Sequence, residues 1–400
     1  MMHQSSEHPS QRLPTPGADE LAHSERLLER IRGLIRDSGP MPFWQFMEQA
    51  LYAPGLGYYS AGRTKFGAAG DFVTAPELGD LFAETLAETL APVLGSGPDR
   101  AFIEVGGGSG RFAAAALAEW ERLDALPSRY LILERSAELR ERQQATLATT
   151  VPGLLDRVAW LDRPPEQPWH GVLFANEVID ALPVHRFLKR KGELCECCVA
   201  IDARGELQWV DGPADAMLRA AVAHIESDLG VGFAERYQSE LLPQLPFWID
   251  AILGTLETGM AVFVDYGYPR REYYLPERSQ GTLTCHYRHR AHDQVLLWPG
   301  LQDLTAWVDF TALAEAGTRI RLPLAGFNSQ AQFLLAAGLL PRAQAAIEGK
   351  GVADGYALAQ EVKELTLPGA MGERFKVMSF ARGIDHVPAA FTAFDQRHRL

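Results

Sequence analysis

The sequence predicts an α/β fold built on a doubly wound, mostly parallel sheet of the Rossmann-like type, with an N-terminal helical extension and an inserted α+β lobe. Three observations support this prediction. Apolar strands alternate with helical patterns from residue 101 onward, which is the rhythm of parallel β-α-β units. The first of these strands ends in a glycine-rich turn that precedes a helix. The rhythm stops after residue 185 and resumes near residue 246, which indicates an insertion.

Local patterning predicts the individual elements. Helices are expected where apolar residues recur at helical spacing, as in the alanine-rich stretch after Arg111 and in a helix that Pro76 opens and that continues to about Leu94. A hairpin is expected around Asp202, within residues 194–210. The strands of the core are expected at residues 101–105, 130–133, 158–161, 171–175, 260–264, 319–322 and 375–381.

These elements divide the chain into consecutive parts. Residues 1–18 are polar, contain Pro14 and Pro16, and are expected to be disordered. The total of 400 residues fits a nucleotide-binding core of roughly 200 residues plus a second lobe. The expected parts are a helical region at 19–95, the first half of the core at 96–185, the inserted lobe at 186–245, the second half of the core with substrate-side loops at 246–385, and a C-terminal tail at 386–400.

Composition and charge exclude several classes of partner. The formal net charge of −13 disfavours nucleic-acid binding, which depends on clustered lysine and arginine. No apolar run approaches the length that spans a bilayer, so no membrane insertion is expected. The N-terminus lacks the apolar core of a secretory signal and carries Glu7 and Asp19, which a mitochondrial transit peptide avoids, so a cytoplasmic location is expected. Four cysteines without a second C-x-x-C pair predict free thiols and no metal site.

The glycine-rich turn, E-V-G-G-G-S-G at residues 104–110, indicates the ligand. Its glycines let the backbone approach a ligand, and the following helix directs free N–H groups toward an anion such as a carboxylate. A dinucleotide site would need glycine in place of Arg111, and no P-loop motif occurs. Glu104 followed by Gly106 and Gly108 instead matches the E-x-G-x-G signature of methyltransferases that bind S-adenosylmethionine (SAM). SAM is therefore the expected cofactor.

Glu134 strengthens this interpretation. It follows the second expected strand, where an acidic side chain can accept hydrogen bonds from both hydroxyls of a ribose. A 2′-phosphate would be repelled by the like charge, so an adenosine-type ligand is favoured. The alternative is a solvated glutamate beside Arg135, which is weakened because the glycine turn lies one β-α unit earlier.

Three further segments carry a resemblance to a known family. They are G-D-F-V-T-A-P-E at 70–77, N-E-V-I-D-A-L-P-V at 176–184, and G-T-L-T-C-H-Y-R-H-R-A-H at 281–292, which leads on to residues 302–310. With the glycine turn they resemble the MidA-like family of class I SAM-dependent methyltransferases over roughly residues 25–385. The mitochondrial members of that family are protein-arginine methyltransferases that assist respiratory complex I assembly. The resemblance implies a class I methyltransferase fold and a protein substrate with arginine as the methyl acceptor.

The resemblance also implies which residues bind the cofactor. Glu104 would lie beside the methionine amino group, Glu134 would hold the ribose, and Asp71 and Thr74 would lie near the cofactor or the substrate channel. Gly107 stands where the family often has a proline that would stiffen the loop, so cofactor binding is expected to be slightly weaker. The complete implied set is Glu104, Gly106, Gly108, Gly110, Glu134, Asp71 and Thr74.

The candidate catalytic residues follow the fourth expected strand. If a helix begins at Asn176, Glu177 and Asp180 are three positions apart and share a face. Two carboxylates there could hold a guanidinium by fork-shaped pairing, keep charge density on the attacking nitrogen and receive its proton. The alternative is that Asn176 or Asp180 caps the helix and that Glu177 favours its positive N-terminus. Asn176 could also orient a substrate amide or amine.

Other residues leave two interpretations open. Tyr266 could wall the substrate channel or simply lie at an interface. His286, His289 and His292 recur every three residues. Metal binding by them is disfavoured because no carboxylates are arranged around them, and one of them as a proton acceptor is the better alternative.

The leading hypothesis is therefore a SAM-dependent methyltransferase that acts on a protein, with arginine as the acceptor by resemblance. One alternative is a small-molecule methyltransferase, in which the inserted lobe closes a pocket instead of a groove. Another is an assembly chaperone that binds SAM without turnover. Glu104, the glycine turn and Glu134 argue against a lost cofactor site, whereas the sequence leaves the oligomeric state open.

Overall fold

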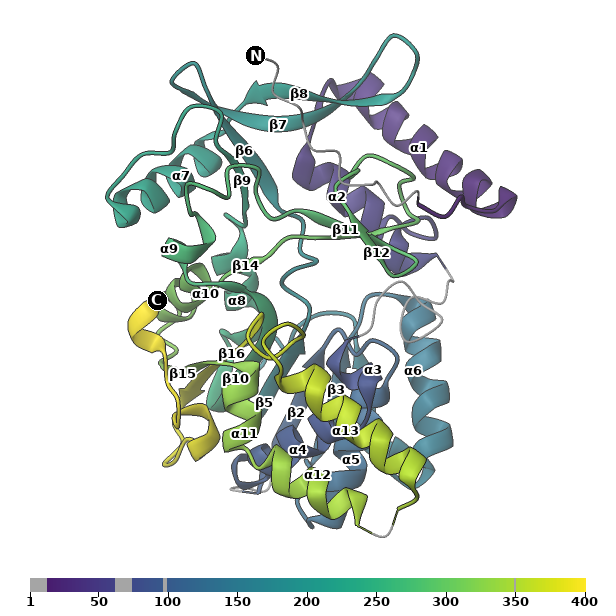
Figure 1. The fold of residues 1–400 in the computed structure, drawn as a ribbon, viewed down its shortest axis with the longest axis vertical. Coiled ribbons are helices and arrows are strands. Elements are labelled where there is room, and N and C mark those ends of the chain that lie inside the picture. The colour runs from purple at the N-terminus through teal and green to yellow at the C-terminus, as the bar shows by residue number, and fades with distance from the viewer. Residues whose placement is uncertain (1–12, 62–73, 96–98, 349) are drawn as a thin grey trace.

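The computed structural model describes residues 13–61, 74–95, 99–348 and 350–400. Most of the tail predicted for residues 1–18 lies outside the described residues. Figure 1 shows a helix-covered sheet in the lower half of the view and a second lobe, rich in antiparallel strands, above it. No described helix combines the length and the apolar character needed to cross a bilayer.

The central sheet has the predicted architecture. Strands β4, β3, β2, β5 and β10 are parallel to one another. Strand β16 runs antiparallel to both of its neighbours, β10 and β15. A short strand, β14 (Val308–Asp309), extends the ladder of β10 at its end. The order across the sheet is β4 (Val158–Leu161), β3 (Arg129–Leu133), β2 (Arg100–Val105), β5 (Trp169–Asn176), β10 (Leu256–Tyr268), β16 (Phe375–Arg382) and β15 (Leu324–Ser329).

Helices cover both faces of this sheet. Successive strand residues point to opposite sides, so each strand contributes to two apolar cores. Phe102 faces one apolar core and its neighbour Ile103 faces the other. The second core is closed by α8 (Leu245–Leu253) and α10 (Phe310–Arg319). The first core is closed by α4 (Leu81–Leu94), α5 (Arg111–Arg122), α6 (Ala137–Thr150), α11 (Gln330–Ala336), α12 (Leu339–Ile347) and α13 (Val352–Thr366).

The order of the strands locates a crevice. The chain enters the sheet at β2, moves outward through β3 and β4, and then returns to the other side of β2 as β5 and β10. Connections that leave in opposite directions cannot close the space above the carboxyl ends of β2 and β5. An open α/β sheet binds its ligands at such a switch point.

The second lobe is antiparallel. The predicted hairpin is confirmed as β7 paired with β8 around Asp202. Helices α1 (Ala18–Ser38), α2 (Phe43–Tyr52) and α7 (Ala216–Leu229) pack in this lobe. Its larger sheet contains β1 (Met41–Pro42), β7 (Glu193–Ile201), β6 (His185–Arg190), β9 (Gln238–Leu241) and β8 (Leu207–Pro213). A smaller sheet contains β12 (Arg290–His292), β11 (Thr284–Tyr287) and β13 (Asp303–Thr305).

Two predicted elements are wrong. The helix expected from Pro76 to Leu94 is broken into α3 (Ala75–Leu78) and α4, because the carboxylate of Glu361 occupies the space beside Gly79 and accepts the Leu81 N–H at 2.8 Å. The strand expected at residues 319–322 is the end of α10 and a turn in which Arg321 has a φ of 56°. The strand itself is β15, which begins at Leu324.

Candidate functional site

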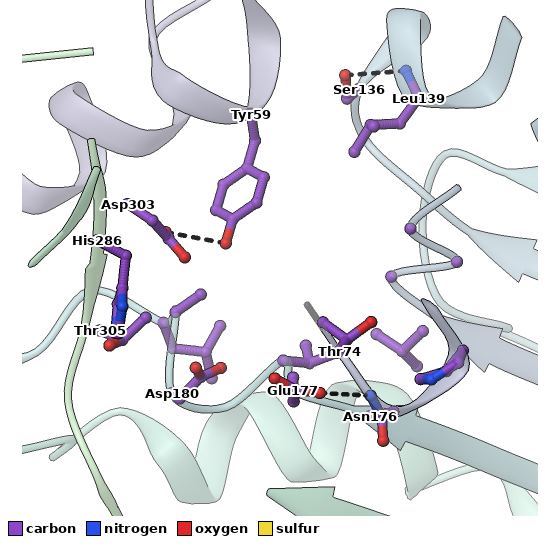
Figure 2. A pocket seen from close by; sticks show the side chains of 18 of the residues that line it. Tyr59, Thr74, Ser136, Leu139, Asn176, Glu177, Asp180, His286, Asp303 and Thr305 are labelled. Atoms are coloured by element: carbon purple, nitrogen blue, oxygen red, sulfur yellow. Dashed lines mark hydrogen bonds between the residues drawn. The ribbon is translucent and has the colours of Figure 1, made fainter. Parts of the chain in front are cut away.

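A cavity of about 1110 Å³ lies at the switch point, between the sheet and the second lobe. The carboxyl ends of β2, β3, β5 and β10 line one side of it. The second lobe contributes Tyr52, Tyr59, His286 and Asp303 to the opposite side. Figure 2 shows side chains from both sides directed toward one common space.

Gly106, Gly107 and Gly108 of the glycine turn line this cavity, whereas Gly110 packs against Gln143 of α6. Gly106, Gly108 and Gly110 have φ values of 69°, 50° and 84°, a region that other residues enter only with strain. The Gly106 N–H donates to the Leu133 carbonyl at 3.0 Å and so ties the turn to the end of β3. Helix α5 begins at Arg111 directly behind the turn, as predicted, and its free N–H groups favour an anionic ligand group.

Glu104 is the buried acid at the start of the turn. The Tyr130 hydroxyl donates to its Oε2 at 2.7 Å. Burial raises the pKa of Glu104 to about 7, the hydrogen bond from Tyr130 opposes this shift, and the charge of Glu134 adds to it. A buried acid with one anchored oxygen suits an ammonium group, which would favour its ionised form.

Glu134 lies at the end of β3, on the same cavity as Gly108. The Ser136 N–H donates to its Oε1 at 2.9 Å and the Gln143 amide to its Oε2 at 3.3 Å. Burial raises the pKa of Glu134, and these hydrogen bonds oppose the shift. The same Gln143 nitrogen donates to the Gly108 carbonyl at 3.1 Å, so the turn and the acid are close neighbours across an open crevice.

The two implied residues of the G-D-F segment have different outcomes. Thr74 precedes α3, is half-buried and lines the cavity, as Figure 2 shows. Asp71 lies outside the described residues.

The candidate catalytic residues lie on a turn, so the condition under which Glu177 and Asp180 would share a helix face is not met. Asn176 is the last residue of β5, and Glu177 has a φ of 53°, which no helix allows. The Glu177 N–H donates to the Val264 carbonyl of β10 at 2.9 Å. The turn nevertheless brings Asn176, Glu177 and Asp180 to the same cavity. Because no helix begins at this turn, the alternative in which Asn176 or Asp180 caps a helix is wrong.

The acids of this turn repel one another. Burial raises the pKa of Glu177 to about 8, with a contribution from the charge of Asp180. Burial raises the pKa of Asp180 to about 6, against the hydrogen bond from Tyr266. The Asn176 amide donates to Glu177 at 3.1 Å, whereas Asp180 Oδ1 is buried without a hydrogen-bond partner among the described residues. An unsatisfied buried acceptor of this kind is suited to a ligand that brings donors.

Several residues around this turn were missed by sequence reasoning. Asp265 at the end of β10 accepts the N–H groups of Ile179 and Asp180 at 3.0 and 3.3 Å and so shapes the turn. Its position at the end of a core strand was the available signal. The Tyr59 hydroxyl donates to Asp303 at 3.0 Å across 244 positions of sequence, and nothing local predicts that pair.

The three histidines lie on the β11–β12 hairpin, and of the three His286 lines the cavity. Burial together with the charge of His292 lowers the pKa of His286. His289 is at the tip of the β11–β12 hairpin with a φ of 59°. Within residues 13–61, 74–95, 99–348 and 350–400, no three histidine, cysteine, aspartate or glutamate side chains gather as a metal site. Tyr266 also lines the cavity, as one of the two interpretations expected.

Known proteins resemble this chain over most of its length. The model of a family described as S-adenosyl-L-methionine-dependent methyltransferase matches residues 79–328. A crystal structure from Burkholderia thailandensis, bound to S-adenosyl-homocysteine, is 42% identical, covers 97% of this chain and 100% of its own, and has a TM-score of 0.90. A second crystal structure from that organism has the same identity and coverage, and a TM-score of 0.88.

Curated relatives are similar at lower identity. The protein arginine methyltransferase NDUFAF7 of Danio rerio is 27% identical over 89% of this chain and 87% of its own length. The human protein of that name is 28% identical over 87% of this chain and 82% of its own length. Both are named mitochondrial, which contradicts the expectation of a cytoplasmic location.

The family match covers more than half of the chain, and the structure bound to S-adenosyl-homocysteine matches nearly all of it. The mostly parallel sheet agrees with the class I fold that the resemblance to the MidA-like proteins implies. The chain belongs to the S-adenosyl-L-methionine-dependent methyltransferase family and is an α/β, class I methyltransferase with SAM as its cofactor.

Proposed function

We propose that this methyltransferase transfers the methyl group to an arginine side chain of a protein substrate. The names of the curated relatives support arginine as the acceptor. The acidic turn supports it independently, because a guanidinium carries the positive charge and the planar set of donors that paired carboxylates bind best.

The observation that carries the proposal is the unsatisfied Oδ1 of Asp180 beside Glu177. Asp180 is 5% exposed, and both side chains line the cavity. Burying two acids whose charges interact is unfavourable unless a cation pairs with them. A neutral hydroxyl acceptor would not compensate that cost, whereas a guanidinium would pair with both acids.

Different residues bind the cofactor and the methyl acceptor. When bound, SAM supplies an electrophilic methyl group, and Glu104, Glu134 and the glycine turn hold the molecule that carries it. Glu177 and Asp180 hold the guanidinium plane in line with the methyl carbon. Methylation leaves the guanidinium nitrogen with a proton to lose. The bound guanidinium holds Glu177 ionised. Because burial raises the pKa of this carboxyl to about 8 when no cation is bound, the carboxylate is basic enough to receive that proton.

Three further roles belong to the same proposal. Asn176 orients Glu177 through its amide and leaves its own buried Oδ1 for a donor on the substrate. Thr74 precedes α3 and lines the cavity, and we assign it to the cofactor end of the channel. We assign Asp71 to the same end by the family resemblance alone.

The test uses methyl-labelled SAM and a lysate of a strain that lacks the gene. We expect label in protein, released on acid hydrolysis as methylarginine, and no label with Glu177→Gln. Label confined to the small-molecule fraction would contradict the proposal and favour a small-molecule methyltransferase. Tight SAM binding without transfer of label would contradict it in favour of a SAM-binding chaperone.

A further inference from the structure

Gln143 is a buried amide at the cofactor side of the cavity whose partners belong to three different elements. It lies on α6 and has no exposed surface. Its Nε2 donates to the Gly108 carbonyl at 3.1 Å and to Glu134 Oε2 at 3.3 Å. Its Oε1 accepts the indole N–H of Trp160, on β4, at 2.8 Å. One side chain thus contacts the glycine turn, the acid of β3 and the neighbouring strand.

The orientation of this amide is fixed by chemistry. The indole of Trp160 can only donate, so it must face the amide oxygen. The Gly108 carbonyl can only accept, so it must face the amide nitrogen. A flipped amide would break both bonds, which leaves both N–H groups of Gln143 directed at Gly108 and Glu134.

Thr146 acts on the same turn from the same helix face. It lies three positions after Gln143, which places the two side chains side by side on α6. Its hydroxyl donates to the Ser109 carbonyl at 2.8 Å. A Cβ at Gly110 would lie 3.0 Å from the Gln143 Cα, so glycine at this position lets α6 approach closely enough for both contacts.

We propose that Gln143, supported by Thr146, is a positioning residue for the cofactor. It holds Glu134 at a fixed distance from the glycine turn. Glu134 can then bind the ribose while the turn contacts the rest of the same cofactor molecule. This inference rests on the proposed role of Glu134 in holding the ribose. A fixed acid costs less to order on binding than a mobile one, which is how a residue without ligand contact raises affinity.

The test compares Gln143→Leu with Gln144→Leu, because Gln144 is the exposed neighbour on the same helix. Calorimetry with S-adenosyl-homocysteine should show affinity lowered about tenfold in Gln143→Leu and unchanged in Gln144→Leu. The preference for S-adenosyl-homocysteine over its 2′-deoxyribose analogue should shrink in Gln143→Leu, because Glu134 is no longer fixed. Trp160→Phe removes only the indole donor and should lower affinity about threefold.

Affinity within twofold of wild type in a folded Gln143→Leu protein would overturn the proposal, and so would lost affinity with the ribose preference intact. If Gln143→Leu does not fold, Trp160→Phe carries the same two readouts. Glu134→Ala, measured in parallel, distinguishes failure of the ribose-binding role of Glu134 from failure of the positioning role of Gln143. An intact ribose preference in that variant would remove Glu134 from the ribose site, and the role of Gln143 would fall with it.

Discussion

The two halves of the cavity use buried carboxyl groups in opposite ways. In the cofactor half, Glu104 and Glu134 each have hydrogen-bond donors from the protein on at least one oxygen. In the acceptor half, burial and the charge of Asp180 raise the pKa of Glu177, and Asp180 Oδ1 has no donor among the described residues. The first half is prepared for a ligand of fixed shape, and the second leaves a buried acceptor atom for a donor that the ligand supplies.

This difference indicates which half binds and which half reacts. Acids that are already oriented lose little freedom when a ligand arrives, so they contribute to affinity. Acids that are left poorly satisfied gain most when a cation reaches them, so they contribute to the transfer step. Substitutions in the two halves should therefore have separable effects.

The largest expected effect is on turnover. We expect Glu177→Gln to lower kcat by about 100-fold or more, because an acid that orients the nucleophile and accepts its proton is lost. SAM affinity should stay within twofold of wild type. Kinetics at saturating SAM together with calorimetry measure both, with Glu121→Gln on the exposed face of α5 as the control. Equal losses of turnover and affinity would show that the two halves are not separable.

The reciprocal change should act on affinity. Glu134→Ala removes a buried acid that would accept two hydrogen bonds from the ribose, so SAM should bind more than tenfold less tightly. Turnover at saturating SAM should remain close to that of wild type. An unchanged dissociation constant by calorimetry would mean that Glu134 does not bind the cofactor. The proposed difference between the cofactor half and the acceptor half would then be wrong.

The cofactor half could be predicted from sequence because its determinants are local. Glu104 and the three glycines lie within seven positions, and their strand-turn-helix context is set by the same residues. Glu134 follows from the next strand in the same unit. Gln143 was missed because a polar residue in a helix gives no sign of which carbonyl it will meet.

The acceptor half could be predicted only in part. Glu177 and Asp180 were found from their place after a core strand, but their local conformation was left open. It is a turn, because β10 fixes it through Val264 and Asp265. The Tyr59–Asp303 pair joins two segments of the second lobe that are 244 positions apart and meet only when that lobe folds. Such contacts depend on tertiary packing, which no local pattern encodes.

The pH dependence of SAM binding sharpens the comparison further. Burial raises the pKa of Glu104 to about 7, and the ammonium of SAM needs the ionised form. Affinity should therefore increase up to tenfold from pH 6 to pH 8 and level off above the pKa. Calorimetry across this range measures it, and Glu104→Gln should flatten the profile. A profile of wild type as flat as that of the variant would mean that Glu104 does not meet the ammonium.

The smallest effect expected is on stability, in the acceptor half. The folded-state pKa of Glu177 is raised to about 8, so its stabilising contribution is complete below the unfolded value of about 4.5 and is lost as the pH rises through about 8. Between pH 6 and pH 7, wild type should lose about 1 kcal/mol of unfolding free energy relative to Glu177→Gln. Urea denaturation measures this difference without adding guanidinium, which would itself bind the acids. Parallel stability curves for the two proteins would mean that the folded-state pKa of Glu177 is not raised, and Glu177 could not then be the base that its pKa makes it.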